Sequence, residues 1–198
     1  MKNLLLISLF FIACSDTNSG NSYSANENDT TVQSDTTTQS LDLPRTTVER
    51  VKYSQEEKII YTGNTTPAEL LAYAQTLIGI PYKYGSIDPA AGFDCSGFIT
   101  HVFNHFNINV PRSSIDFTNV KREVPVAEAK AGDIVLFTGT DSSIRDVGHM
   151  GIITSNDNST VNFIHSTSGK ANGVTITPMN KYYMGRFVKV LRIFPGND

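Results

Sequence analysis

Three residues in this 198-residue chain have side chains that suit covalent catalysis: Cys95, His149 and His165. A cysteine thiolate is a strong nucleophile, and an imidazole within hydrogen-bond reach can take up its proton and deliver it to a leaving amine. A third polar group that orients this imidazole completes a triad. The first question is therefore whether the elements around these residues bring them together.

Cys95 lies in the stretch GFDCSGFITHVF, where a loop gives way to a helix that we expect to begin near Asp94. Asp94 suits the N-cap position, and an apolar stripe follows at helical spacing: Phe98, Ile99, Val102, Phe103 and Phe106. Backbone N–H groups and the dipole at the helix start are expected to lower the pKa of the Cys95 thiol. The alternative is that Cys95 is a small buried apolar residue, as a cysteine near a helix start often is.

The two histidines lie on consecutive predicted strands, 149–154 and 161–165, which the turn SNDNS connects. If these strands form an antiparallel hairpin, the start of one lies beside the end of the other. His149 and His165 then become neighbours, and His165 can fix the ring orientation and tautomer of His149. The alternative is that each is an ordinary polar residue at a strand end.

His101 and His105 have the i, i+4 spacing of some zinc motifs, in the sequence HVFNH. No glutamate follows the first histidine, and no third ligand is in view. With Gly97, Thr100 and Asn104 they fall opposite the apolar stripe, and we expect a solvated helix face there. The sequence predicts neither a metal site nor a cofactor.

Composition limits the remaining possibilities. The hydrophobic fraction of 39% suffices for one domain with an ordinary core. The net charge is −3, and no basic stripe is present, which argues against nucleic acid as the main partner.

Residues 1–13, MKNLLLISLFFIA, have the pattern of an export signal: a positive start, a short apolar block and a small residue at the end. The alternative is a partly buried N-terminal helix, but the polar tract that follows offers it nothing to pack against. The sequence FIAC resembles the lipobox of bacterial lipoproteins, although Phe11 stands where Leu is usual. Cys14 would then carry acyl chains that anchor the protein to a membrane, and Cys95 would be the one remaining thiol.

Residues 14–47 are rich in Ser, Thr, Asn and Asp and are interpreted as a flexible tether. Residues 48–65 form a lead-in segment, with a strand or a short helix packing on the domain. The compact domain, 66–198, opens with a capping box of Thr66 and Glu69, with Pro67 between them. Leu70, Leu71, Ala74, Leu77 and Ile78 fall on one face of that helix, which Gly79 and Pro81 end. Ser113 or Ser114 can cap a short third helix.

Five short apolar runs follow, separated by turn clusters: 134–138, 149–154, 161–165, 174–177 and 187–194. Helices first and an antiparallel sheet afterwards predict the α+β class, with the N-terminal helices packed on the sheet.

Together these stretches resemble the NlpC/P60 family of cell-wall cysteine endopeptidases. The resemblance runs from about residue 66 to 194 and rests on AQTLIGIPYKYG, GFDCSGFITHVF, VPRSS, AGDIVLF, VGHMGII and FIHSTSGKANGV, in that order. It implies a papain-like α+β fold. There are two departures: Ser86 stands where a second glycine is usual, and the loop SIDPAAG is longer than in some members.

The resemblance implies Cys95 as nucleophile, His149 as base and acid, and His165 as the orienting residue. Tyr82 matches a tyrosine beside the catalytic cysteine, and Asp94 and Ser96 match positions that hold the free amine of the substrate. The implied activity is hydrolysis of peptidoglycan stem peptides or muropeptides at the γ-D-glutamyl–diamino acid bond. Together with the lipobox at Cys14, we expect a monomer in the cell envelope, anchored to the outer membrane or the cell surface.

Two other functions remain open at this point. One is an amidase or acyltransferase on the same scaffold, of the CHAP type, which the histidine at position 165 disfavours. The other is a non-catalytic lipoprotein that only binds fragments of the cell wall.

Overall fold

The computed structural model describes residues 58–141, 143–157 and 159–197. The predicted signal peptide, Cys14, the tether and the first part of the lead-in segment lie outside these residues. The described part of the lead-in segment packs on the domain, as expected. Lys58 forms a parallel β-bridge with Val120, and the side chain of Ile60 is buried.

The first helix, α1 (Pro67–Thr76), begins as the sequence predicts. The Thr66 hydroxyl accepts from the Glu69 N–H, and the Glu69 carboxylate accepts from the Thr66 N–H at 2.9 Å, so the capping box is complete. The helix buries Leu70, Leu71 and Ala74. The prediction that Ile78 lies on the buried face is wrong, since this residue is 49% exposed. The helix ends at Thr76, so the helical spacing that placed Ile78 on that face does not extend to it.

The second helix, α2 (Cys95–His105), has Asp94 as its N-cap, and the carboxylate of Asp94 accepts from the Gly97 N–H. The predicted stripe is buried from Phe98 to Phe103, and Phe106 is partly buried. Gly97 and Thr100 were expected on the exposed side and are buried instead. The first turn of α2 lies against the carbonyl of Ser86, so closely that a Cβ atom at position 97 would overlap it.

The predicted solvated face is confirmed only in part: Asn104 and His105 are exposed, whereas His101 is partly buried. The Tyr73 hydroxyl of α1 lies 2.9 Å from Nε2 of His101, and the Tyr73 ring stacks on His105 with 3.6 Å between centroids. The two histidines therefore belong to the contact between α1 and α2. Within the described residues, no three His, Cys, Asp or Glu side chains gather as metal ligands would.

Six strands form one sheet in the order β1-β6-β2-β3-β4-β5, and every neighbouring pair is antiparallel. The strands are β1 (Glu123–Val124), β2 (Ile134–Thr138), β3 (Val147–Asn156), β4 (Val161–Thr167), β5 (Gly173–Pro178) and β6 (Phe187–Leu191). All five predicted strands are present. The last one ends at Leu191 rather than at 194, and the short β1 was not predicted.

Four short helices complete the described residues: η1 (Ser114–Asn119), η2 (Val126–Glu128), α3 (Lys181–Arg186) and η3 (Pro195–Asn197). The predicted third helix is η1, with Ser113 at its N-cap position but without a side-chain capping bond. Helix α3 was not predicted. Asn180 caps it by accepting from two N–H groups of the first turn.

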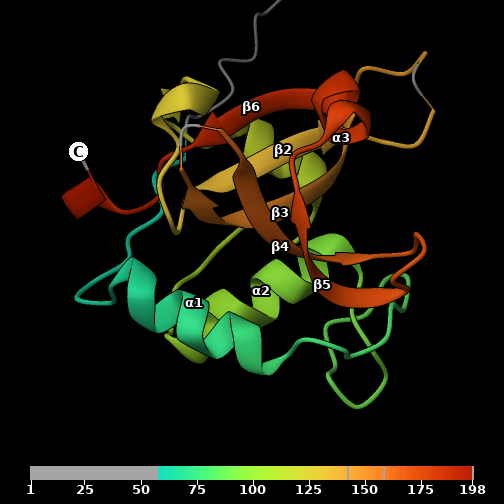
Figure 1. Cartoon of the computed structure of the whole chain (residues 1–198). Coiled ribbons are helices and arrows are strands. Elements are labelled where there is room, and N and C mark those ends of the chain that lie inside the picture. Colours follow the sequence, from blue (N-terminus) through green and yellow to red (C-terminus); the bar gives the residue numbers. More distant parts are fainter. Residues whose placement is uncertain (1–57, 142, 158, 198) are drawn as a thin grey trace, which may run out of the picture. The chain divides into compact units, whose positions relative to one another are not determined.

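The N-terminal helices pack on the antiparallel sheet, as the α+β prediction requires, and each face of the sheet contributes to a core. Helices α1 and α2 lie together on one side of it (Figure 1), over a core that includes Ile134, Leu136, Ile152 and Ile164. A second core lies on the opposite face, around Val135, Phe137, Ile153, Phe163 and Tyr183. Every residue of β2 is therefore buried. In the described part of the chain, no helix has the length and apolarity needed to cross a membrane.

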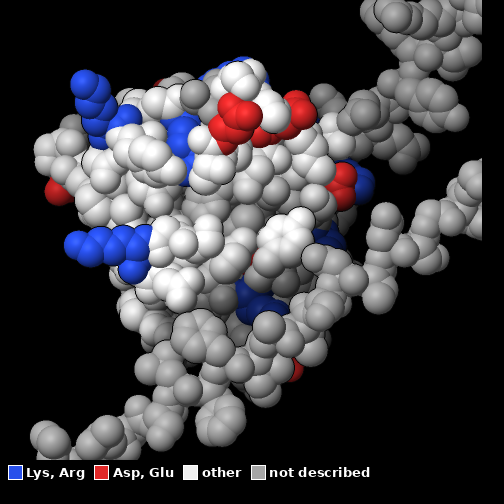
Figure 2. Space-filling model, turned by 90° about the vertical axis from the view of Figure 1, so that its right-hand side faces the viewer, with Lys and Arg blue, Asp and Glu red and all other residues white. Residues whose placement is uncertain are grey.

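Charge is distributed without a basic stripe on the face that Figure 2 presents. Small groups of acidic and basic side chains there are separated by wide uncharged areas. Among the described residues of this face, nothing resembles the continuous cationic surface that binds a nucleic acid backbone.

Candidate active site

A cavity of about 610 Å³ opens where the start of α2 meets the ends of β2 and β3. Its lining includes Tyr82, Cys95, Gly148, His149, Tyr183 and Arg186. The structure thus places two of the three predicted catalytic side chains in one cavity. His165 is fully buried and lies behind His149.

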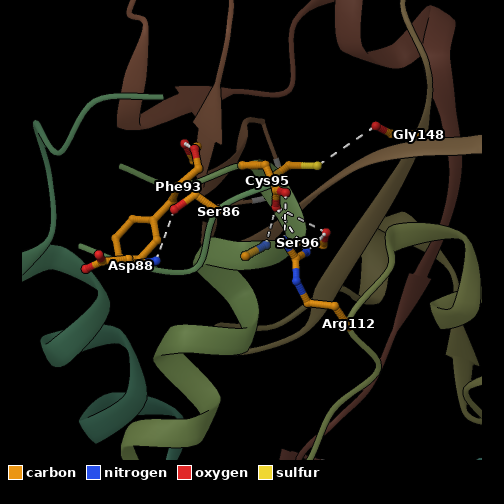
Figure 3. Close-up of polar contacts among 10 residues, drawn as sticks. Ser86, Asp88, Phe93, Cys95, Ser96, Arg112 and Gly148 are labelled. Atoms are coloured by element: carbon orange, nitrogen blue, oxygen red, sulfur yellow. Dashed lines mark hydrogen bonds and ion pairs between the residues drawn. The ribbon is translucent and has the colours of Figure 1, made fainter. Parts of the chain in front are cut away.

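Cys95 is the first residue of α2 and is only partly exposed. Its Sγ atom points toward β3, 3.9 Å from the carbonyl oxygen of Gly148, the residue before His149 (Figure 3). Because Cys95 is at the helix start, its own N–H and that of Ser96 have no partner within the helix. These two groups are available to a negatively charged atom in the cavity.

The pKa prediction for Cys95 is wrong in direction. Burial of the thiol raises its pKa to about 11, and the neighbouring Asp94 carboxylate raises it further. Backbone N–H groups of Cys95, Ser96 and Met150 favour the thiolate, as expected of a helix start, but they do not outweigh burial. The thiol of the free protein is therefore protonated near neutral pH.

His149 and His165 are neighbours, as the predicted hairpin requires. Strands β3 and β4 pair antiparallel with Ile152 opposite Ile164, and Nε2 of His149 lies 2.8 Å from Nδ1 of His165. Nε2 of His165 lies in turn 3.0 Å from the hydroxyl of Thr177 on β5. A polar relay therefore crosses three adjacent strands and ends at the cavity.

Burial keeps both imidazoles neutral. The pKa of His149 lies well below its usual value, mainly because the ring is buried. The neighbouring His165 and the positive charge of Arg186 lower this pKa further. Burial also lowers the pKa of His165 to about 4, again with a contribution from Arg186. A neutral imidazole can accept a proton, so His149 has the protonation state of a general base.

The second core fixes the orientation of this histidine pair. Phe137 stacks beside His149, and Phe163 lies tilted against His165, with Tyr183 in contact with both imidazoles. Arg186 donates to the carbonyls of Thr138 and Gly139, next to the cavity. Sequence reasoning missed Tyr183 and Arg186, since they lie on the unpredicted helix α3.

Tyr82 lies beside Cys95 at the cavity, where the resemblance placed it. Its backbone forms a parallel bridge with Phe93, two residues before the cysteine. Burial raises the pKa of the phenol, and the nearby Cys95 and Asp94 raise it further. Tyr82 is therefore a neutral hydrogen-bond donor near the thiol.

Asp94 and Ser96, predicted to hold the substrate amine, are buried and are not part of the lining of this cavity. Both are engaged by Arg112, whose guanidinium forms an ion pair with the Asp94 carboxylate and donates to the Ser96 hydroxyl. Sequence reasoning missed Arg112, although it lies in the stretch VPRSS on which the resemblance partly rests. The amine-binding role of Asp94 and Ser96 stays a prediction.

The loop that departs from the family pattern supports the start of α2. The Ser86 carbonyl accepts from the Asp94 N–H at 3.1 Å. The Ser86 hydroxyl accepts from the Asp88 N–H at 3.2 Å (Figure 3). Asp88 then accepts from the Ala90 N–H and closes a turn. The backbone of residue 86 thus contacts the N-cap, while the serine hydroxyl that departs from the family pattern bonds within the loop.

Comparisons with known proteins agree with this architecture. The model of the NlpC/P60 family matches residues 79–192. The chain is 32% identical over 139 residues to the gamma-DL-glutamyl hydrolase of Bacillus subtilis. This match covers 68% of the chain and 32% of the hydrolase. The chain is also 32% identical over 127 residues to the peptidoglycan endopeptidase RipB of Mycobacterium tuberculosis. That match covers 58% of the chain and 48% of RipB.

A solved structure from Staphylococcus aureus, described as similar to lipoprotein and of the NLP/P60 family, superposes with a TM-score of 0.56. It is 25% identical, and the match covers 67% of this chain and 42% of that one. The chain spans less than half the length of each of these three relatives.

Proposed function

The chain belongs to the NlpC/P60 family, and we propose that it is a cysteine peptidase that hydrolyses peptidoglycan stem peptides. The observation that carries this proposal is the relay that ends at one cavity: Cys95 and His149 line it, and His165 is bonded behind His149. The arrangement suits nucleophilic acyl transfer, because nucleophile, base and orienting group follow one another in space.

In the proposed mechanism, Sγ of Cys95 attacks the carbonyl carbon of the scissile amide while its proton passes to Nδ1 of His149. The N–H groups at the start of α2, with the Tyr82 hydroxyl, stabilise the oxyanion. The C–N bond then breaks, and His149 protonates the leaving amine. Water, deprotonated by His149, hydrolyses the resulting thioester and regenerates the thiol.

The two contacts of His165 are compatible with the tautomers that this mechanism needs. For Nδ1 of His149 to accept the proton, Nε2 must carry the hydrogen and donate it to Nδ1 of His165. His165 then carries its hydrogen on Nε2 and donates to Thr177.

For the substrate, we propose the bond between γ-D-glutamate and a diamino acid. Two relatives support this choice by their names, one as a gamma-DL-glutamyl hydrolase and one as a peptidoglycan endopeptidase. Asp94 and Ser96 would bind the free amine of the stem peptide only if their contacts with Arg112 rearrange, since both side chains are buried and engaged by that guanidinium.

The test is incubation of the purified protein with defined stem peptides, with and without an amino-terminal sugar, and analysis of the products by mass. Cleavage at the γ-D-glutamyl bond is expected, and Cys95→Ala should abolish it while the melting temperature stays close to that of the parent. Substantial turnover by pure Cys95→Ala protein would reject Cys95 as the nucleophile.

We also propose that the protein is exported and anchored in the cell envelope through acylated Cys14, in the outer membrane or at the cell surface. The proposal rests on the sequence of residues 1–14. Growth with radiolabelled palmitate should label the parent and not Cys14→Ser, whereas equal labelling of both would exclude Cys14 as the acylation site.

A further inference from the structure

Arg112 forms a two-pronged contact with the start of α2. Its Nη2 lies 2.9 Å from Oδ2 of Asp94, and its Nη1 lies 3.2 Å from Oδ1 of the same carboxylate. The same Nη1 also lies 2.9 Å from the Ser96 hydroxyl. The guanidinium therefore binds the residue before Cys95 and the residue after it (Figure 3).

These contacts come from a separate part of the chain. Arg112 lies in the loop between α2 and η1, after the end of the helix whose start it contacts. Paired N–H groups that meet a carboxylate give a directional contact, which a single lysine ammonium does not reproduce. Asp94 and Ser96 are buried, so this contact holds side chains that solvent barely reaches.

The Asp94 carboxylate has two opposed effects on Cys95. As the N-cap it holds the first turn of α2 in place by accepting from Gly97. As a negative charge next to the thiol it disfavours the thiolate, an effect second only to burial. A cation that binds the Asp94 carboxylate leaves it in place as the N-cap of α2 and offsets its negative charge beside the Cys95 thiol.

We propose that Arg112 is a positioning residue for Cys95, which clamps Asp94 and Ser96 on either side of the nucleophile and compensates the carboxylate charge beside the thiol. Its catalytic meaning rests on the proposed function. The clamp itself can be tested on the thiol alone, without any peptide substrate.

Other titratable and charged groups also face Cys95, and the experiment must leave them unchanged. From the elements around the cavity these are Tyr82, His149, Lys170, Tyr182, Tyr183 and Arg186. None of them is altered in the variants below, so a change in the reactivity of Cys95 reports on Asp94 and Arg112.

The measurement is the rate of alkylation of Cys95 by iodoacetamide at pH 8, in a Cys14→Ser background where Cys95 is the only cysteine. Arg112→Met is expected to react about tenfold more slowly, because an uncompensated carboxylate raises the thiol pKa by about one unit. Arg112→Lys keeps the charge and should stay within about threefold of the parent. Adding Asp94→Asn to Arg112→Met should restore the parent rate.

The direction of the change separates this role from a merely structural one. If Arg112 only stabilised the fold, its loss would loosen the helix start, expose Cys95 and speed alkylation. An unchanged or faster rate in Arg112→Met overturns the proposal. Should that variant fail to fold, Arg112→Gln decides: it removes the charge but keeps an amide that can donate to Asp94 or Ser96, so an unchanged or faster rate overturns the proposal.

Arg192→Met is the matched control, because it breaks another Arg–Asp pair, with 3.4 Å between Arg192 and Asp133. It should lower the melting temperature and leave the alkylation rate of Cys95 unchanged. The outcomes for clamp and activity are distinguishable. If the parent cleaves no stem peptide but Arg112→Met is alkylated more slowly, the proposed function fails and the clamp proposal stands. If the parent is an active peptidase but Arg112→Met is alkylated at the parent rate, the clamp proposal fails.

Discussion

The hydroxyl of Thr177 lies 3.0 Å from Nε2 of His165, the ring nitrogen that His149 does not contact. In the proposed mechanism, Thr177 on β5 accepts the Nε2 hydrogen of His165 on β4, and Nδ1 of His165 accepts the Nε2 hydrogen of His149 on β3. A side chain two strands away from His149 would then favour the tautomer in which Nδ1 of His149 accepts the proton.

Thr177→Val should weaken this preference, because valine has the shape of threonine but cannot accept the His165 hydrogen. Loss of a neutral hydrogen bond that contributes about 1 kcal/mol to the activation free energy lowers kcat about fivefold. Peptide cleavage kinetics measure it, with Thr175→Val on the same strand as the control. A kcat equal to that of the parent would mean that Thr177 does not set the tautomer.

His149→Ala and His165→Ala should differ in severity. The first removes the proton carrier, and we expect a loss of kcat of at least about a hundredfold. The second removes only its orientation, and a milder loss is expected. Both variants are compared with the parent by steady-state cleavage of a stem peptide. Equal and near-total losses would indicate that the two histidines share the proton transfer.

Alkylation of Cys95 should depend on pH in a way that reflects its raised pKa of about 11. Only the thiolate reacts, so the rate should still rise steeply between pH 8 and 10, where that of a free cysteine levels off. Iodoacetamide labelling of the Cys14→Ser protein, with free cysteine as the reference, measures this. A rate that is already maximal at pH 6 would instead indicate a resting thiolate–imidazolium pair.

Stability should fall as the pH is lowered from neutral. The folded pKa of His165 is about 4, below the unfolded value of about 6.5, so between these values the unfolded state binds more protons. The free energy of unfolding should decrease over this window by up to about 3 kcal/mol, and His149 acts in the same direction. Urea unfolding at several pH values tests this, and His165→Gln should show a shallower dependence.

Gly97→Ala should destabilise the fold. Its Cβ would overlap the Ser86 carbonyl and approach Asp94 Oδ1 to 2.8 Å, so the start of α2 would have to shift. We expect a loss of about 1–3 kcal/mol in the free energy of unfolding, measured by urea titration. Gly185→Ala in α3 is the control, since no atom lies within 4 Å of its Cβ position. Equal stabilities for the two variants would contradict the close approach.

Local patterns were sufficient to predict much of this structure. The Thr66–Glu69 capping box, the apolar period of α2 and the short apolar runs of β2 and β4 depend on near neighbours in the sequence. The adjacency of His149 and His165 followed from one short turn, because a hairpin fixes which residues lie side by side.

Features that depend on distant contacts could not be predicted in this way. The contact of Tyr73 with His101 requires the packing of two helices, and Arg112 reaches Asp94 only after the chain has folded back. The pKa of Cys95 was predicted in the wrong direction for the same reason. Its helix position can be read from the sequence, but the depth of its burial is a property of the assembled domain.

The protonated state of Cys95 affects how readily this thiol is oxidised. Oxidation by peroxide begins at the thiolate and proceeds through sulfenic acid to irreversible acids. A thiol whose pKa is raised by burial is seldom ionised between catalytic events, and so offers oxidants little to attack. The resting thiol therefore reacts slowly but resists oxidation, which would benefit a protein that is exported, as proposed above, beyond the reducing interior of the cell.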